Sequence, residues 1–404
     1  MSSPLPSGSR TSEKTDLTGE GIAGERQLPP GGLDEAAPLR DAGEVARELY
    51  GFEAFHLTRL PGGRVNDSFL IESDQGAFVL QRLSDFFMGD EAPALNWRLV
   101  RQALSERSGL ADPPLPPIFP DRFGRWLASP PGGRGFWRLT GFVAGRPAPQ
   151  SPAGAREAAR LLGFLHHFLN SPQPLELRPL PEGEFTNQRL TRPDDFAAIG
   201  LHYRGHPLLD ELAPLLDQAA QAAARLPLFP GFLNLFSLRD VTIHGDPKAD
   251  NFLFSPDGRA LSLLDWDSAG PGHLLVDIAE MMRSWGGAGP AGPDPDRLAA
   301  VLEGYAESGL RLTRDETELL APLLRAIVLN LTRRYLTDAL AQVYFQWDSR
   351  NYPSLYQQNR LKAEKMLALD DYLLDHELQL GRIFQKSYAL GLTRRQEPPV
   401  FGPL

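Results

Sequence analysis

A cluster of polar residues interrupts an otherwise apolar stretch near position 245. The segment 243–254 reads IHGDPKADNFLF and places Asp246, Lys248 and Asn251 within six residues, between two strand-like runs. Asp265 follows fourteen residues after Asn251, at the end of the apolar run LSLL. An Asp can orient a hydroxyl, a Lys can neutralise phosphate, and Asn and Asp oxygens suit Mg²⁺. The set therefore predicts phosphoryl transfer.

The spacing of these residues is typical of a kinase catalytic loop. Asp246 and Asn251 lie five positions apart, as the Asp and Asn of that loop do. A Pro-Asp-Gly turn between Asn251 and Asp265 predicts a hairpin that returns Asp265 to Asn251. We therefore assign Asp246 and Lys248 to catalysis, and Asn251 and Asp265 to the metal. His244 is expected to brace the loop rather than to act as a base.

The motifs HGDPKADN and LLDWD resemble those of the aminoglycoside phosphotransferase/choline kinase superfamily. Within it, the chain is similar to the bacterial N-acetylhexosamine 1-kinases and their relatives, on the segments GGRVNDSFLI, FVLQRL, LDWDSAGPGHLLVDIAEMMRSW and TRRYLTDALAQVYFQ. The resemblance spans about residues 45 to 385. Two features differ: the branch usually has Asn where this chain has Gly245, and the segment LPEGEFTNQRL, where the sugar kinases seat their sugar, matches poorly.

The resemblance implies an ATP- and Mg²⁺-dependent enzyme that phosphorylates an alcohol group of a small molecule. It makes a sugar, such as an N-acetylhexosamine at its anomeric hydroxyl, the leading acceptor. One alternative is a kinase for an aminoglycoside, a choline-like amine or an amino alcohol. An alternative of another class is a catalytically inactive nucleotide-binding interaction module, which a missing lysine on the third strand favours. The intact catalytic motif argues against that module.

The elements that must position these residues fall into two groups. Residues 55–83 read as three short strands, 91–108 as a helix and 124–142 as a second hairpin, whereas helical patterns dominate from about 150 onward. We therefore predict an α+β, two-lobed, protein-kinase-like fold. A small antiparallel-sheet lobe (the N-lobe, 43–141) would precede a large, mainly helical lobe (the C-lobe, 142–395).

The two ends of the chain are expected to be tails. Residues 1–42 are rich in Ser, Gly and Pro, a composition typical of a disordered segment, with Asp41 as the cap of the first helix. Residues 396–404 would form a short second tail.

The nucleotide is expected under the segment PGGRVNDSF, because glycine leaves backbone N–H groups free to face phosphate. Kinases also place a cation on the third strand. Here FVLQRL offers Gln81 and Arg82 on opposite faces; charge favours Arg82, and the resemblance favours Gln81. Glu91 is a weak candidate partner for that cation. The segment 138–147 would link the lobes and hold the adenine. The expected nucleotide-binding residues are Gly63, Asn66, Ser68, Gln81, Arg82, Thr140 and Phe142.

The acceptor is expected beside Asp246. Asp67, Asp267 and Arg283 are the candidate acceptor contacts. Asp277, on the helix that follows, is expected to bond the catalytic loop, and His166 and His167 are expected to be packing residues.

Composition limits the partners. The net charge of −10 and a pI near 5.4 argue against a nucleic-acid binder. The chain contains no cysteine, which excludes thiolate chemistry and disulfides. The sequence has no run of 18 apolar residues, so we expect no membrane span. The N-terminus has no basic region followed by an apolar one, as a secretory signal would. We therefore expect a cytoplasmic enzyme whose partner is a small-molecule acceptor.

Overall fold

The structure is a computed structural model. It describes residues 37–60, 66–83, 90–130, 135–180, 189–237, 241–289 and 292–394. Gly63 and most of the two predicted tails lie outside the described residues. None of the helices in those ranges is long and apolar enough to cross a membrane.

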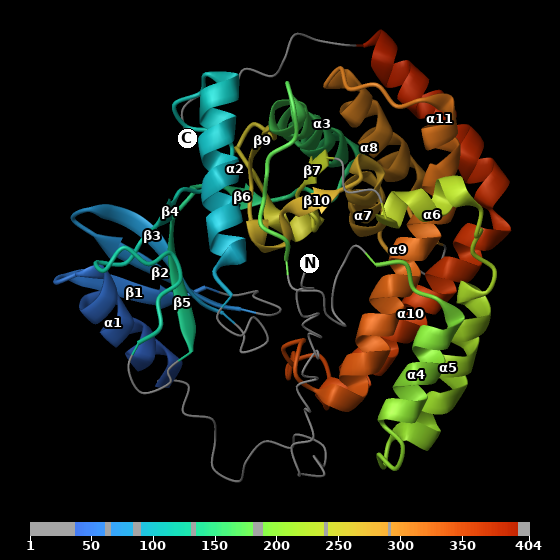
Figure 1. The fold of residues 1–404 in the computed structure, drawn as a ribbon, viewed down its shortest axis with the longest axis horizontal. Helices are drawn as coiled ribbons and strands as arrows, with labels where there is room; N and C mark the ends of the chain where they lie inside the picture. The colour runs from blue at the N-terminus through green and yellow to red at the C-terminus, as the bar shows by residue number, and fades with distance from the viewer. Residues whose placement is uncertain are drawn as a thin grey trace, which may run out of the picture.

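The N-lobe is an antiparallel sheet backed by one helix (Figure 1). Its strands are β1 (Phe55–Arg59), β2 (Asp67–Ser73), β3 (Gly76–Leu83), β4 (Ile118–Phe119) and β5 (Phe136–Gly141), in the order β1-β2-β3-β5-β4. Alternate residues such as Phe69, Leu80 and Trp137 are buried on one face. Against them packs α1 (Ala37–Tyr50).

Helix α1 begins four residues before the expected cap, so Asp41 lies inside the helix. Pro38 occupies the first turn, where its fixed φ and missing N–H are tolerated. The other face of the sheet is turned toward the C-lobe, and α2 (Ala92–Ser108) stands between the two lobes (Figure 1).

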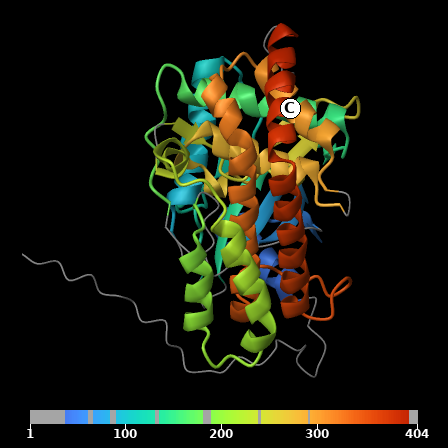
Figure 2. The same cartoon turned by 90° about the vertical axis from the view of Figure 1, so that its right-hand side faces the viewer.

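The C-lobe is mainly helical, with helices α3 (Pro152–Asn170), α4 (Pro193–His202), α5 (Leu209–Ala223), α6 (Pro230–Ser237), α7 (Leu274–Gly286), α8 (Pro295–Glu307), α9 (Arg314–Ala341), α10 (Leu355–Asp375) and α11 (Glu377–Thr393). The long helices α9, α10 and α11 run along one side of the lobe (Figure 2). Apolar residues of α3, α7, α8 and α9 share one core. The predicted α+β fold with two kinase-like lobes is thus confirmed.

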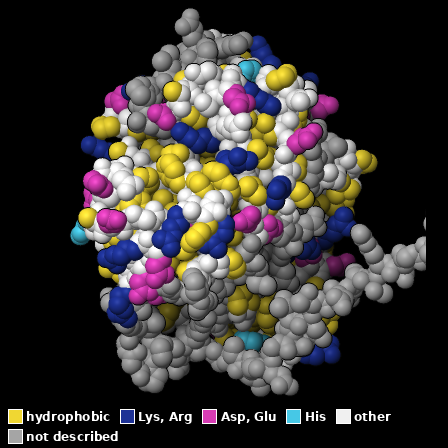
Figure 3. All heavy atoms as spheres, turned by 60° about the vertical axis from the view of Figure 1, so that its left-hand side comes forward, with side chains coloured by type: hydrophobic (Ala, Val, Ile, Leu, Met, Phe, Trp, Pro, Cys, Tyr) yellow, Lys and Arg dark blue, Asp and Glu magenta, His cyan; other side chains and the backbone are white. Residues whose placement is uncertain are grey.

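Short strands at the lobe boundary carry the catalytic motif. Strand β7 (Val241–Ile243) pairs antiparallel with β10 (Gly270–Gly272), and β8 (Phe252–Phe254) pairs with β9 (Ala260–Leu263) and with β6 (Arg146–Pro147). The predicted hairpin between Asn251 and Asp265 is therefore present as β8–β9. On the face shown in Figure 3, basic and acidic side chains of the described residues are interspersed with apolar ones and form no continuous basic track.

Candidate active site

The hairpin β8–β9 brings the two ends of the motif together. The backbone N–H of Leu264 donates to the carbonyl of Asn251 at 2.7 Å, so Asp265 follows directly beside Asn251. At the start of the loop, Gly245 has a φ of +85°. A residue with a Cβ is disfavoured in that region, which gives a physical reason for Gly at this position.

Two buried side chains brace the catalytic loop. The carboxylate of Asp277, on α7, accepts the backbone N–H groups of His244 and Gly245 at 2.8 Å each. The Nδ1 of His244 accepts the N–H of Asp246 at 3.1 Å, and its Nε2 lies 3.0 Å from the carbonyl of Leu264. Burial lowers the pKa of His244, which favours the neutral ring. These contacts agree with the bracing roles expected for both residues.

Asp277 has a further partner in His166. The Nε2 of His166 lies 3.0 Å from the Asp277 carboxylate, and its Nδ1 lies 2.9 Å from the hydroxyl of Tyr305. His166 thus positions the Asp277 carboxylate, which in turn positions the catalytic loop. His167 contacts the ring of Phe168.

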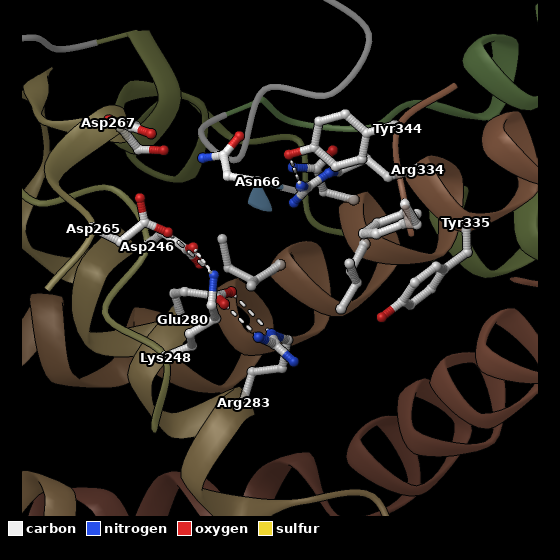
Figure 4. Close-up of a pocket in the computed structure, with 15 residues that line it drawn as sticks. Asn66, Asp246, Lys248, Asp265, Asp267, Glu280, Arg283, Arg334, Tyr335 and Tyr344 are labelled. Carbon is white, nitrogen blue, oxygen red and sulfur yellow. Dashed lines mark hydrogen bonds and ion pairs between the residues drawn. The ribbon is translucent and has the colours of Figure 1, made fainter. Parts of the chain in front are cut away.

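Asp246 and Lys248 form an ion pair at the floor of the site (Figure 4). Burial alone would lower the pKa of Lys248, but the carboxylates of Asp246 and Asp265 raise it above its usual value. Burial would likewise raise the pKa of Asp246, but the Lys248 ammonium lowers it. Both groups are therefore charged near neutral pH. The ammonium also lies 3.9 Å from Asp265, between the two acids.

Asp265 has the backbone and the surroundings of a metal ligand. Its φ of +62° is unusual for a residue with a side chain, and such conformations gather at functional sites. Burial and the nearby charge of Asp267 raise the pKa of Asp265 to about 6. The Oδ2 of Asp267 is buried without a hydrogen-bond partner. A divalent cation would relieve this concentration of negative charge.

The set of oxygen donors also fits Mg²⁺. The Nδ2 of Asn251 donates to the carbonyl of Asp246 at 2.8 Å, so the amide is held beside the loop. Asn251 and Asp265 both line the same cavity. The described residues contain no cluster of three or more His, Asp or Glu that could hold a metal by themselves. Mg²⁺ commonly takes one or two protein ligands and completes its shell with phosphate and water, as this site would allow.

A cavity of about 480 Å³ lies between the lobes and has the layout of a nucleotide site. Val79 lies on the N-lobe side, and Leu253 and Leu264 lie on the C-lobe side, so a flat base would pack between apolar walls. The segment that links the lobes closes one end. Eight residues predicted from the sequence line this cavity: Asn66, Ser68, Gln81, Thr140, Phe142, Lys248, Asn251 and Asp265.

A second cavity of about 90 Å³ has Asp246 in its wall and shares Asn66, Lys248 and Asp265 with the first. Asp246, Asp265 and Asp267 line one side of it, and Arg334, Tyr335 and Tyr344 line the opposite side (Figure 4). Glu280 and Arg283 pair with each other at its base. Asn66 reaches it from the N-lobe and borders both cavities. A small acceptor here would stand directly in front of Asp246.

Three residues predicted from the sequence lie elsewhere. Arg82 is on the β3 face opposite Gln81, beside Gly135, and lines neither cavity. Asp67 pairs with Arg59 across β1 and β2 at 2.6 Å. Glu91 is exposed at the start of α2 and lines neither cavity. Strand alternation predicted that Gln81 and Arg82 lie on opposite faces of β3, but it did not indicate which of the two faces lines the cavity.

The sequence analysis did not identify five residues of the site. They are Arg138, Glu280, Arg334, Tyr335 and Tyr344. The segment TRRYLTDALAQVYFQ carried part of the family resemblance, but its periodicity indicated only a packed helix. Arg138 gave no local signal, because its role depends on contacts with β3 and with the C-lobe.

The comparisons with known proteins agree with this geometry. The family model for the phosphotransferase enzyme family matches residues 56–311, more than half of the chain. No curated protein matches the sequence.

Solved structures share the fold at low identity. A microcompartment-associated aminopropanol kinase is 15% identical, with a TM-score of 0.56 over 84% of this chain and 98% of that one. An amicoumacin kinase in complex with AMP-PNP, Ca²⁺ and Ami is 15% identical, with a TM-score of 0.54 over 84% of this chain and 94% of that one. An aminoglycoside phosphotransferase from Alicyclobacillus acidocaldarius is 19% identical, with a TM-score of 0.50 over 82% and 94%. The chain thus belongs to the phosphotransferase enzyme family and is a small-molecule phosphotransferase that acts on hydroxyl groups.

Proposed function

We propose that the protein uses ATP and Mg²⁺ to phosphorylate a hydroxyl of a small acceptor that carries no positive charge. A sugar such as an N-acetylhexosamine, phosphorylated at its anomeric hydroxyl, is the leading candidate. The cytoplasm, where ATP is available, is the proposed location. The choice of an uncharged acceptor rests on the aromatic rings of the second cavity, over which cations of the protein already lie.

Cations of the protein already lie over those rings. The guanidinium of Arg334 lies 5.2 Å from the ring centre of Tyr344 and 5.8 Å from that of Phe345. The ammonium of Lys362 lies 5.7 Å from the ring centre of Tyr335. Choline-like amines are recognised by aromatic faces that are free to receive a cation. An ammonium acceptor would here find a cation of the protein already over the ring of Tyr344 and another over the ring of Tyr335.

Three of the four acids that line the cavity are also paired within the protein. Glu280 binds Arg283, Asp246 binds Lys248, and Asp267 binds a buried arginine described below. An aminoglycoside carries several ammonium groups and needs acids that are free to meet them. Hydroxyl groups, by contrast, can bond to paired charges, and tyrosine rings give a sugar an apolar surface.

The side chains divide the chemistry between them. Asp246 would accept a hydrogen bond from the acceptor hydroxyl and receive its proton as the oxygen attacks phosphorus. Lys248 would balance charge between Asp246 and the transferred group. Asn251 and Asp265 would hold Mg²⁺, which when bound neutralises charge on the phosphates. The Arg334 side of the cavity would orient the acceptor, so that its hydroxyl faces Asp246.

A screen for ADP release tests the proposal. Purified protein with ATP and MgCl₂ should be offered N-acetylhexosamines, neutral hexoses, an aminoglycoside, choline, an amino alcohol and homoserine. We expect turnover with one of the sugars and none with the cationic acceptors. Turnover with choline, an amino alcohol or an aminoglycoside alone would contradict the acceptor class. Binding of Mg²⁺ and ATP without turnover on any of them would favour the inactive module instead.

Arg334→Met separates the acceptor site from the nucleotide site. The variant should raise the KM for the accepted sugar roughly ten- to a hundredfold, the range expected when a charged hydrogen bond is lost. The affinity for AMP-PNP with Mg²⁺ should not change, because Arg334 lines only the smaller cavity. If instead the variant began to accept choline, the two-cation explanation for its exclusion would gain direct support.

A further inference from the structure

One buried cation near the site has no part in the chemistry above. Arg138, on β5, is 1% exposed, and its guanidinium lies 4.9 Å from the ring centre of Trp97 on α2. A buried arginine is costly unless acids and acceptors surround it. Its contacts therefore show which groups the fold keeps together around this charge.

Those contacts cross from one lobe to the other. The Nε of Arg138 donates to the Oε1 of Gln81 at 2.9 Å, and Gln81 in turn donates from Nε2 to Ser68 at 3.1 Å. The Nη1 donates to the Oδ1 of Asp267, in the C-lobe. The Nη2 lies 4.0 Å from the Oδ1 of Asp265.

The partners of Arg138 are wall residues of the two cavities. Gln81 and Ser68 line the nucleotide cavity, Asp267 lines the acceptor cavity, and Asp265 lines both. Arg138 itself lies behind the walls. It therefore acts on bound molecules through these side chains, as a positioning residue.

Two atoms of this network are buried without a hydrogen-bond partner: the Nη2 of Arg138 and the Oδ2 of Asp267. Such atoms are uncommon, and each needs an explanation. They belong to the same ion pair, beside the carboxylate of Asp265. The pair thus leaves one donor and one acceptor unused directly beside Asp265, the carboxylate proposed to hold Mg²⁺.

We propose that Arg138 supplies the positive charge that kinases usually carry as a lysine on the third strand. In this chain that strand has Gln81, whose cross-strand partner is Arg138. The planar fork of Arg138 fixes the Gln81 amide with one N–H and the Asp267 carboxylate with another, while its charge faces Asp265. Lysine has no such fork and could not hold the same groups at once. The residue thereby sets the affinity of the site for the phosphates of a nucleotide.

This inference rests on the proposed ATP- and Mg²⁺-dependent activity, and binding measurements separate the two. Calorimetry should compare wild type with Arg138→Met and Arg138→Lys, each titrated with AMP-PNP plus MgCl₂ and, separately, with adenosine. We expect the Met variant to lose roughly ten- to a hundredfold in affinity for AMP-PNP with Mg²⁺. The Lys variant should lose about tenfold, because its charge remains but the fork does not. Adenosine has no phosphate, so its affinity should not change.

Arg82→Met is the matched control, because Arg82 lies one residue from Gln81 on the opposite face of β3. It should bind AMP-PNP with Mg²⁺ as the wild type does. Loss of affinity in the Arg82 variant, with no loss in the Arg138 variants, would assign the cation to Arg82 and overturn the inference. Equal losses for adenosine and AMP-PNP in the Arg138 variants would overturn it too, since they would indicate a purely structural role.

If Arg138→Met does not fold, Arg138→Lys tests the proposal by itself. Wild-type affinity of the Lys variant for AMP-PNP with Mg²⁺ would refute the role of the planar guanidinium. A wild-type protein that binds no AMP-PNP with Mg²⁺ would overturn the proposed function and, with it, this inference.

Discussion

Asp338 holds the loop that carries two aromatic residues into the acceptor cavity. Its carboxylate is fully buried near the end of α9. The Oδ1 accepts the backbone N–H groups of Val343 and Tyr344 at 2.8 Å each, and the Oδ2 accepts that of Phe345 at 3.0 Å. The Nδ2 of Asn359 donates to the Oδ2 at 2.9 Å. One side chain thus fixes three consecutive peptide groups.

The size of the effect follows from these bonds. A hydrogen bond to a charged group contributes about 1.5 kcal/mol, so the loss of three such backbone bonds in Asp338→Ala removes about 4.5 kcal/mol from the stability of the closed loop. Because each 1.4 kcal/mol corresponds to a factor of ten, opening of the loop should become more frequent by up to about three powers of ten. The freed amides can bond to water, so this value is an upper bound.

Hydrogen exchange measured by mass spectrometry reads this opening directly. Amides at 343–345 should exchange much faster in Asp338→Ala than in the wild type, and those at 241–251 should not change. Asp348→Ala is the matched control, because this exposed carboxylate makes its bonds in the next turn. Unchanged exchange at 343–345 in the Asp338 variant would refute the reasoning.

The same variant should affect one substrate only. Tyr344 and Phe345 line the acceptor cavity and not the nucleotide cavity. We therefore expect a higher KM for the acceptor and unchanged affinity for AMP-PNP with Mg²⁺.

Three further substitutions test the catalytic loop and its support. Asp246→Asn should lower kcat by roughly two to four powers of ten, as expected for loss of acid–base catalysis, with nucleotide affinity kept; near-normal ADP release would contradict its catalytic role. Asp265→Asn should weaken the binding of AMP-PNP with Mg²⁺ but not that of adenosine in calorimetry, and equal affinity for both would argue against a metal ligand. Asp277→Ala should lower the free energy of unfolding by about 3 kcal/mol, because two backbone N–H groups lose a charged acceptor. Denaturant melts would measure that loss against Asp257→Ala, on an exposed turn, which should leave the midpoint where it is.

The sequence by itself determined the catalytic loop. Asp246, Lys248 and Asn251 are local in the chain, and the Pro-Asp-Gly turn returns Asp265 through a hairpin of neighbouring residues. Local contacts of this kind follow from turn chemistry and alternation, which a short segment specifies. The two-lobed order was predictable for the same reason, since each strand or helix shows its own period.

Only the tertiary structure decided what surrounds that loop. The bond between Gln81 and Arg138 joins residues 57 positions apart, and it depends on which face of β3 meets the C-lobe. The wall formed by Arg334, Tyr335 and Tyr344 comes from α9 and the loop after it, which reach Asp246 only when the helices pack. The sequence states which side chain occupies each position, but long-range packing and strand register determine which side chains it contacts. The sequence therefore indicated the residues that we propose to take part in phosphate transfer, and the fold decided which side chains lie in front of them.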